Sequence, residues 1–82
     1  MDIVSLIEFL VKSIVSNPDM VSAKEFSNDD DEKTIIQVLV AESDMGAVIG
    51  RDGKIASAIR TIAKSAAYTN KLKKVEINFD AF

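Results

Sequence analysis

Residues 46–55 read GAVIGRDGKI, and this stretch decides the fold because it sets two glycines, Gly50 and Gly53, between two helical patterns. Glycine lets a backbone turn tightly and approach a ligand without a Cβ in the way. The amides that open the next helix lack partners within it and carry partial positive charge, which suits phosphate oxygens. Lys54 stands in that first turn, where a cation opposes the helix dipole and indicates an anionic ligand. Taken alone, Gly-x-x-Gly also fits a plain turn between helices.

Two other glycine-rich phosphate motifs are excluded by the same stretch. A P-loop needs a glycine five positions before Gly53 and a Ser or Thr after the lysine, but those positions hold Val48 and Ile55. The dinucleotide fingerprint Gly-x-Gly-x-x-Gly would also need a glycine at Val48. The remaining interpretation is a helix–Gly-x-x-Gly–helix corner.

The N-terminal segment predicts an amphipathic helix, because apolar residues recur there at steps of three and four. Asp2 is its expected N-cap, and Asn17-Pro18 is expected to end it, since a residue before proline is biased away from helical angles. The stripe assigned to the core comprises Ile3, Leu6, Ile7, Leu10, Val11 and Ile14.

The rest of the chain predicts three strands and two further helices. Residues 28–32 are Asn28 and four consecutive carboxylates without the ligand spacing of a calcium loop, so a solvated turn is expected there. The strand of residues 73–79 alternates apolar and polar side chains. The expected elements are strands at 21–27, 34–41 and 73–79, a helix at 44–49 capped by Ser43, and a helix at 54–68.

This order of elements, α-β-β-α-α-β, predicts one α+β domain over residues 1–82. Segregated strands and helices favour two layers, with three helices on one face of a three-stranded sheet.

Charge is distributed unevenly along the chain. The net charge is −3, yet residues 46–74 hold seven bases and one acid, a net charge of +6. An acidic protein with one concentrated basic segment can present a positive face to phosphate. Ordinary scatter of charge is the alternative.

Composition excludes several function classes. The sequence has neither cysteine nor histidine, so it lacks the thiol nucleophile and the most common general base, and no metal-ligand spacing is present. We therefore expect no enzyme activity, metal or cofactor. The apolar runs of the sequence are shorter than the ~20 residues that span a bilayer. The N-terminus begins with the acid Asp2 rather than with a positively charged region, so no signal peptide is expected. The expectation is a cytoplasmic protein without membrane insertion.

The glycine corner in its context resembles a KH domain with the type II order. More narrowly, Asp44-Met45-Gly46, residues 48–54 (VIGRDGK) and residues 58–61 (AIRT) resemble the small stand-alone bacterial KH proteins of the KhpA family. The resemblance covers essentially the whole chain.

The resemblance implies that residues 50–53 clamp the backbone of about four unpaired RNA nucleotides. The bases would then lie in a narrow apolar groove between the following helix and the second strand, with Ala47 and an exposed strand edge at residues 38–40 as contributors. Asp52 partly offsets the charge of Arg51, and no aromatic residue is near the loop, so modest affinity is expected. The residues assigned to RNA are Gly50, Arg51, Asp52, Gly53, Lys54, Arg60, Val48 and Ile55.

The resemblance further implies a homodimer, a heterodimer with a second KH protein of the Jag type, and a role as a post-transcriptional regulator or RNA chaperone linked to cell shape. The apolar positions of the helix at 54–68 are candidates for the dimer interface, although the isoleucines among them are more often core residues. These positions are Ile59, Ile62, Ala63 and Ala66. The alternative function is a protein-interaction adaptor that uses the KH fold as a dimerisation scaffold.

Overall fold

A computed structural model describes residues 2–28, 33–69 and 74–82 of the chain. Its elements follow one another in the predicted order α-β-β-α-α-β, joined by short 3₁₀ turns. They are α1 (Ile3–Lys12), η1 (Pro18–Met20), β1 (Ser22–Asn28), β2 (Lys33–Val40), η2 (Glu42–Asp44), α2 (Met45–Ile49), η3 (Arg51–Gly53), α3 (Lys54–Thr69) and β3 (Lys74–Ala81).

The three strands form one mixed sheet in the order β1-β2-β3. β1 pairs antiparallel with β2, from Ser22 opposite Leu39, and β2 pairs parallel with β3, from Lys33 opposite Lys74 to Val40 opposite Ala81. The parallel pairing requires a crossover, which α2 and α3 supply. β2 is therefore the central strand, and the outer edge of β3 is free of strand partners.

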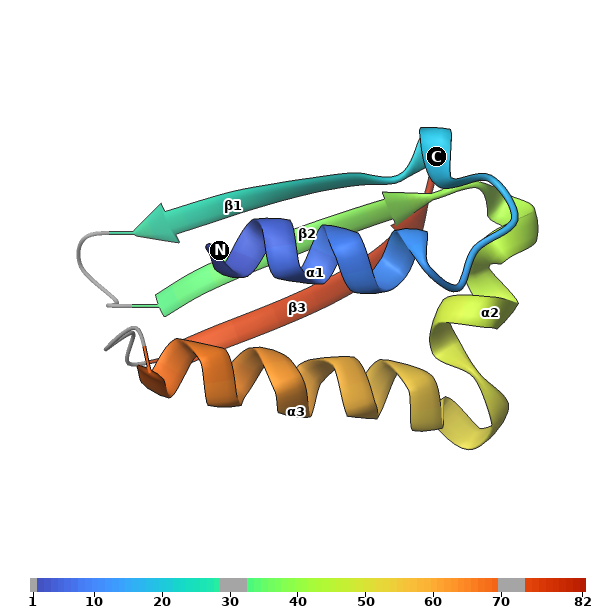
Figure 1. The fold of residues 1–82 in the computed structure, drawn as a ribbon. Helices are drawn as coiled ribbons and strands as arrows, with labels where there is room; N and C mark the ends of the chain where they lie inside the picture. The colour runs from blue at the N-terminus through green and yellow to red at the C-terminus, as the bar shows by residue number, and fades with distance from the viewer. Residues whose placement is uncertain (1, 29–32, 70–73) are drawn as a thin grey trace.

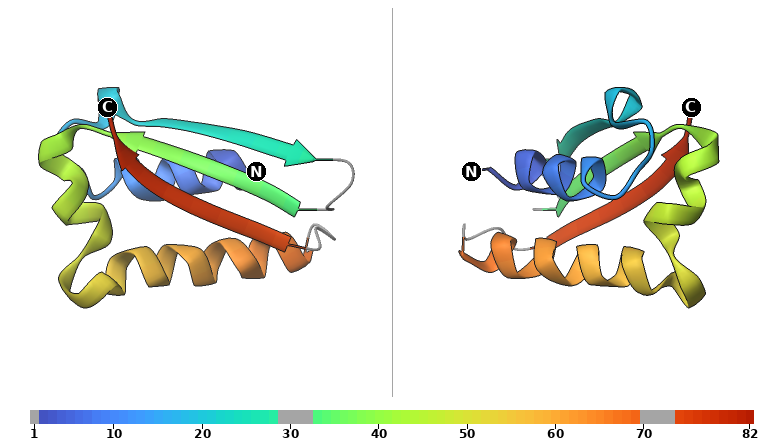
Figure 2. Two further views of the ribbon diagram at one scale, coloured as in Figure 1. Left: turned by 180° about the vertical axis from the view of Figure 1, so that it is seen from behind. Right: turned by 45° about the vertical axis from the view of Figure 1, so that its right-hand side comes forward.

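The helices lie on one side of this sheet (Figure 1). α1 crosses the sheet face, α2 stands at the end where β2 and β3 finish, and α3 runs beside β3. From behind, the strands are in front of α1 (Figure 2, left). The α+β class and the type II order of elements are thus confirmed.

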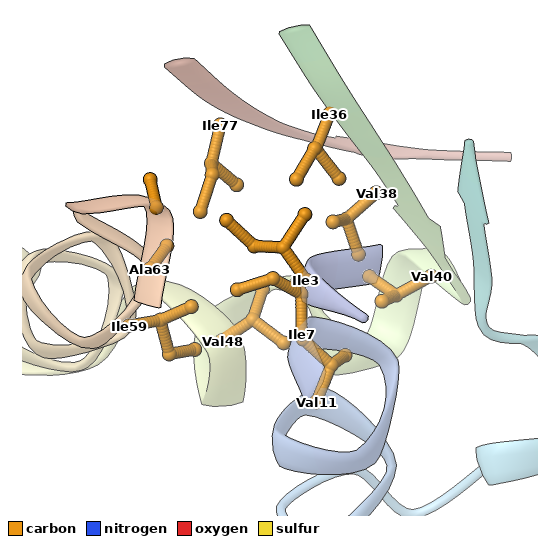
Figure 3. Packing of buried hydrophobic residues seen from close by; sticks show 11 residues of the cluster. Ile3, Ile7, Val11, Ile36, Val38, Val40, Val48, Ile59, Ala63 and Ile77 are labelled. Carbon is orange, nitrogen blue, oxygen red and sulfur yellow. The ribbon is translucent and has the colours of Figure 1, made fainter. Parts of the chain in front are cut away.

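The core lies between the sheet and the helices. Along β2 buried residues alternate with half-buried ones, and three of the buried ones point towards α1 and α3 (Figure 3). Complete burial of such an aliphatic side chain stabilises a domain by about 1.5–3 kcal/mol. The cluster comprises Ile3, Ile7 and Val11 of α1, Ile36, Val38 and Val40 of β2, Val48 of α2, Ile59, Ala63 and Ala67 of α3, and Ile77 of β3.

α1 begins as predicted but ends earlier. The Asp2 carboxylate accepts a hydrogen bond of 2.7 Å from the Ser5 N–H, which confirms the N-cap. The helix ends at Lys12 rather than at Asn17-Pro18, and its last turn tightens, since the Ile14 N–H donates to the Val11 carbonyl three residues back at 3.1 Å. Ile14 therefore falls outside the helix and is 41% exposed, which corrects its assignment to the core.

The start of α2 also differs from the prediction, since Asp44 rather than Ser43 occupies the N-cap position. Residues 29–32 of the expected turn and Lys73 of the expected third strand lie outside the described residues. Within those described, no three metal-ligating side chains gather in one place. None of the described helices has both the length and the apolar character needed to cross a bilayer.

Candidate nucleic-acid interface

The glycine corner is a sharp reversal between α2 and α3. Gly50 has φ 75° and ψ 177°, Asp52 has φ 57° and ψ 26°, and Gly53 has φ 74°. The Gly50 conformation is essentially limited to glycine, whereas aspartate tolerates the left-handed region that Asp52 adopts. The sequence therefore places its two glycines where the backbone geometry needs them.

Hydrogen bonds within the corner hold this geometry. The Gly50 N–H donates to the Gly46 carbonyl at 2.9 Å, and the Gly53 N–H donates to the Gly50 carbonyl at 3.3 Å. The Lys54 N–H then donates to the Arg51 carbonyl, and α3 continues from there. A helix of 16 residues begins at this point, and its positive dipole end faces the corner.

Two cations and one carboxylate project from the corner. Arg51, Asp52 and Lys54 are all exposed, and none of them forms an ion pair with another described residue. Their net charge of +1 adds to the field of the helix terminus, so an anion gains from both. The geometry brings the predicted residues of this corner together, with half-buried glycines between exposed polar side chains: Gly50, Arg51, Asp52, Gly53 and Lys54.

A groove lies between the C-terminal half of α3 and the first half of β3, and Arg60 is its lining residue nearest in sequence to the corner. Its volume is about 620 Å³, and it is open to solvent. Apolar side chains line its floor and charged side chains stand at its rim. The lining residues are Arg60, Lys64, Ala67 and Tyr68 of α3, Lys74, Val75, Glu76 and Ile77 of β3, and Lys33 of β2.

Arg60 is held in this groove by the edge of β3. Its Nε and Nη2 both donate to the Ile77 carbonyl at 3.3 Å, and its guanidinium carbon lies 5.4 Å from the centre of the Phe79 ring. Because β3 is an edge strand, that carbonyl has no strand partner on its outer side. Arg60 therefore supplies a positive charge at a fixed place, with guanidinium donors that bond no other residue in the described part of the chain.

Two parts of the predicted groove are wrong. Val48 is fully buried in the core, so its side chain cannot line a surface groove. The expected exposed edge at residues 38–40 does not exist, because β2 is the central strand and Val38 and Val40 are fully buried. The exposed edge that faces α3 belongs to β3 instead.

The candidate interface residues of α3 separate into two groups. Ile59 is 5% exposed and Ala63 is 0% exposed, so both belong to the core and their assignment to a dimer interface is wrong. Ile62 remains 42% exposed and Ile55 39% exposed, while Ala66 is half-buried. Positions 55, 62 and 66 share one flank of α3, and Arg60, Lys64 and Tyr68 lie on the opposite flank of its buried face.

Several groove residues escaped the prediction. Tyr68 is 86% exposed at the far end of the groove, and Lys33, Lys74 and Glu76 come from the strands. The four-residue steps from Arg60 to Lys64 and Tyr68 were a usable signal, since they place these side chains on one flank of a helix. The strand residues gave no such signal, because their approach to α3 depends on the pairing of β2 with β3.

Asp44, at the start of α2, ties the segment that leads into the glycine corner to the chain that follows α1. Its carboxylate is buried and accepts hydrogen bonds from the Ser16 N–H at 3.0 Å, the Asn17 N–H at 3.0 Å and the Asn17 side-chain amide at 3.1 Å. The bond from the Ser16 N–H contributes most to lowering the pKa of the Asp44 carboxyl below its ordinary value of 3.8, while burial opposes it. In the sequence, Asp44 was recognisable only as part of a motif, without this role.

Comparison with known protein families gives a match over nearly the whole chain. A family described as "KhpA/KhpB, KH domain" matches residues 4–79. Among similar proteins, one from Clostridium acetobutylicum is 45% identical over 73 residues, which cover 88% of this chain and 95% of that protein. One from Borreliella burgdorferi is 43% identical over 75 residues, covering 90% and 89%. One from Caldanaerobacter subterraneus is 41% identical over 70 residues, covering 85% and 91%. Each of the three is named RNA-binding protein KhpA.

Among solved structures, a variant of Era from Aquifex aeolicus bound to GDP and an aluminium fluoride contains the same fold. The TM-score is 0.69 at 13% sequence identity, and the match covers 98% of this chain but 30% of the Era chain. At this identity the similarity concerns the arrangement of helices and strands alone.

Proposed function

The chain belongs to the KhpA/KhpB family of KH domains, and we propose on that premise that it binds single-stranded RNA through the corner at residues 50–53. The observation that carries the proposal is the exposed corner itself, in which two glycines at positive φ bring Arg51 and Lys54 to the start of α3. The functional unit is a single KH domain over residues 1–82. Membership of this family also agrees with the expectation that the chain is not an enzyme.

The corner would hold the sugar–phosphate backbone. Neither glycine has a Cβ to keep a phosphate away from the main chain, and the dipole of α3 favours negative charge at this point. Arg51 can give two parallel hydrogen bonds to one phosphate, whereas Lys54 acts as a point charge. Asp52 repels the same phosphate, so the corner binds with modest strength and little sequence preference.

The groove would receive the bases. Ala67, Val75 and Ile77 provide an apolar floor of limited width, and the tethered Arg60 offers donors to base edges or to the next phosphate. Ile55 stays 39% exposed beside the corner, so it remains in the proposed RNA contact set, from which Val48 is now removed. The bases would thus lie against α3 and the free edge of β3.

The direct test of this proposal is Arg51→Asp. The substitution places two acids between the glycines without touching the positions whose backbone φ is positive. We expect affinity for a fluorescently labelled single-stranded RNA, followed by anisotropy, to fall about tenfold or more, because a like charge replaces a phosphate contact. The slope of log K against log salt should also shrink by about 0.7, which corresponds to one lost phosphate contact on a single strand.

Lys24→Asp is the matched control, since Lys24 is an exposed base on β1 and the change in charge is the same. Thermal unfolding of both variants reports whether the fold is intact. An equal loss of RNA affinity in both variants would mean that only the net charge of the protein matters. Wild-type protein that does not bind the RNA would contradict the proposal altogether.

Dimerisation is a second candidate activity, favoured by one observation. Ile62 is 42% exposed on the flank of α3 opposite the groove, although Ile59 and Ala63 beside it are buried. A homodimer, or a heterodimer with a Jag-type KH protein, would cover this flank and leave the groove open on the opposite one. Two weak RNA sites linked in this way bind one transcript more tightly than either does alone, as a post-transcriptional regulator or RNA chaperone requires.

Ile62→Asp should therefore shift the protein to monomer in sedimentation at concentrations where the wild type is dimeric. A charge buried in a subunit contact raises the dissociation constant by on the order of 100-fold. Ile14→Asp is the control, because Ile14 is 41% exposed and Ile62 is 42% exposed. A persistent dimer of Ile62→Asp would assign the contact to another surface.

A further inference from the structure

The far end of the groove holds an aromatic side chain that the proposed four-nucleotide clamp does not use. Tyr68 is 86% exposed in the last turns of α3 and lines the groove next to Lys64 and Lys74. An aromatic ring this exposed contributes little of the apolar burial by which aromatic side chains usually stabilise a small domain. Its place suggests a ligand rather than a role in folding.

Tyr68 lies on the same helix that begins at the glycine corner. Ser57, Arg60, Lys64 and Tyr68 follow one another at steps of three and four residues, which puts them on one flank of α3. At 1.5 Å per residue, this line is roughly 17 Å long. Figure 1 shows the last turns of α3 beside the start of β3 and the two elements diverging towards the corner, so the free strand edge bounds the far end of this line.

The charges around Tyr68 suit a nucleic-acid backbone. Lys64 and Lys74 form no ion pair within residues 2–28, 33–69 and 74–82. Among the described lining residues the one acid, Glu76, is paired with Lys33 at 3.2 Å, so its charge is largely compensated. These described residues are therefore net positive around an exposed ring, which is the combination that binds single strands by stacking and charge.

We propose that Tyr68, with Lys64 and Lys74, forms a stacking subsite for an RNA base beyond the four nucleotides held at the corner. This inference rests on the proposed function, because the corner fixes the strand that reaches Tyr68. Stacking on a tyrosine ring is tolerant of base identity, since every base has a flat π-face. The subsite would thus lengthen the RNA footprint without adding sequence preference.

The test compares oligoadenylates of four and eight nucleotides. Wild-type protein should bind the longer probe more tightly, and Tyr68→Ala should reduce that advantage by roughly 5-fold or more, the lower bound for loss of one base–aromatic stack. Binding of the four-nucleotide probe should not change in Tyr68→Ala. Tyr68→Phe should behave as wild type, because it keeps the ring and loses only the hydroxyl.

Phe9→Ala is the matched control, since Phe9 is a 61% exposed aromatic residue on α1. The eight-nucleotide probe also contains several overlapping four-nucleotide sites for the corner. The gain in affinity from this statistical effect should remain in every variant. Tyr68 is the only tyrosine and the chain has no tryptophan, so intrinsic fluorescence reports on this residue alone. Its emission should be quenched by the longer probe far more than by the shorter one.

The outcomes separate the inference from its premise. Equal length advantages for wild type and Tyr68→Ala, or equal quenching by both probes, would overturn the stacking subsite while leaving the corner in place. Failure of the wild type to bind either probe would overturn the proposed function itself. A loss in Tyr68→Ala that Tyr68→Phe shares would show that the hydroxyl, and not the ring, makes the contact, and this too would contradict the proposal.

Discussion

Replacing Gly50 with alanine is expected to lower the free energy of unfolding by about 2–5 kcal/mol, through backbone strain and overpacking together. With φ 75° and ψ 177°, Gly50 has a conformation that side chains with a Cβ rarely adopt. A Cβ there would also meet the side chain of Ile55, lying 2.8 Å from its Cβ and 2.9 Å from its backbone nitrogen. The backbone nitrogen cannot move aside without disturbing the first turn of α3. Thermal or denaturant unfolding measures the loss.

The other two glycines are the controls for this prediction. Gly53 has φ 74° but open space around its missing Cβ, so Gly53→Ala should cost only the strain, on the order of 1–2 kcal/mol. Gly46 has neither positive φ nor a close neighbour, and Gly46→Ala in α2 should be neutral or stabilising by up to about 1 kcal/mol. Equal losses at Gly50 and Gly53 would contradict the steric part of the argument.

The expected ranking of stability losses among the glycine variants affects how RNA binding should be tested. A variant at Gly50 would lose both the fold and the ligand, and its failure to bind RNA would have two explanations. Arg51→Asp avoids this difficulty because Arg51 is not among the described residues with positive φ. The backbone of the corner and its chemistry can therefore be separated experimentally.

Periodicity predicted the parts of the fold that depend on local sequence. The apolar steps of α1 and the alternation of Val75, Ile77 and Phe79 in β3 fixed which sides of these elements are buried. The glycine corner was also predictable, because positive φ at Gly50 and Gly53 is a property of the residues themselves. The end of α1 was not predictable, since the last turn tightens at Ile14, four residues before the proline, and no local signal marks that point.

Long-range packing determined what the sequence could not predict about the candidate site. The apolar positions of α3 extend around more than one flank, and only the placement of the sheet decides that Ile59 is buried and Ile62 exposed. Val48 lies in a helix of five residues, too short for a pattern to show which side faces inward. Arg60 is positioned by the Ile77 carbonyl, 17 residues away, and such a contact follows from topology alone.

Asp44 leads to the second large expected effect. Replacing it with asparagine should lower the unfolding midpoint at neutral pH by on the order of 10 °C, since hydrogen bonds to a charged group are lost in a small domain. One carboxylate oxygen accepts from the Ser16 N–H and the other accepts twice from Asn17. An asparagine has a single acceptor oxygen, so its amide N–H₂ must face at least one of these donors. Asp19→Asn, at an exposed acid of η1, is the control for the loss of charge.

The effect of Asp44 should depend on pH in a defined direction. Because the folded-state pKa of Asp44 is lowered below 3.8, the carboxylate adds stability that is fully present above the unfolded pKa and is lost as pH falls through the folded one. The difference in unfolding midpoint between wild type and Asp44→Asn should therefore be constant from neutral pH to about pH 5 and shrink below about pH 4. Asp2, whose pKa is also lowered, titrates in both proteins and cancels in this difference. A difference in unfolding midpoint that stays constant down to acid pH would mean that Asp44 acts through its shape rather than its charge. The contact between the start of α2 and the chain after α1 would then not be electrostatic.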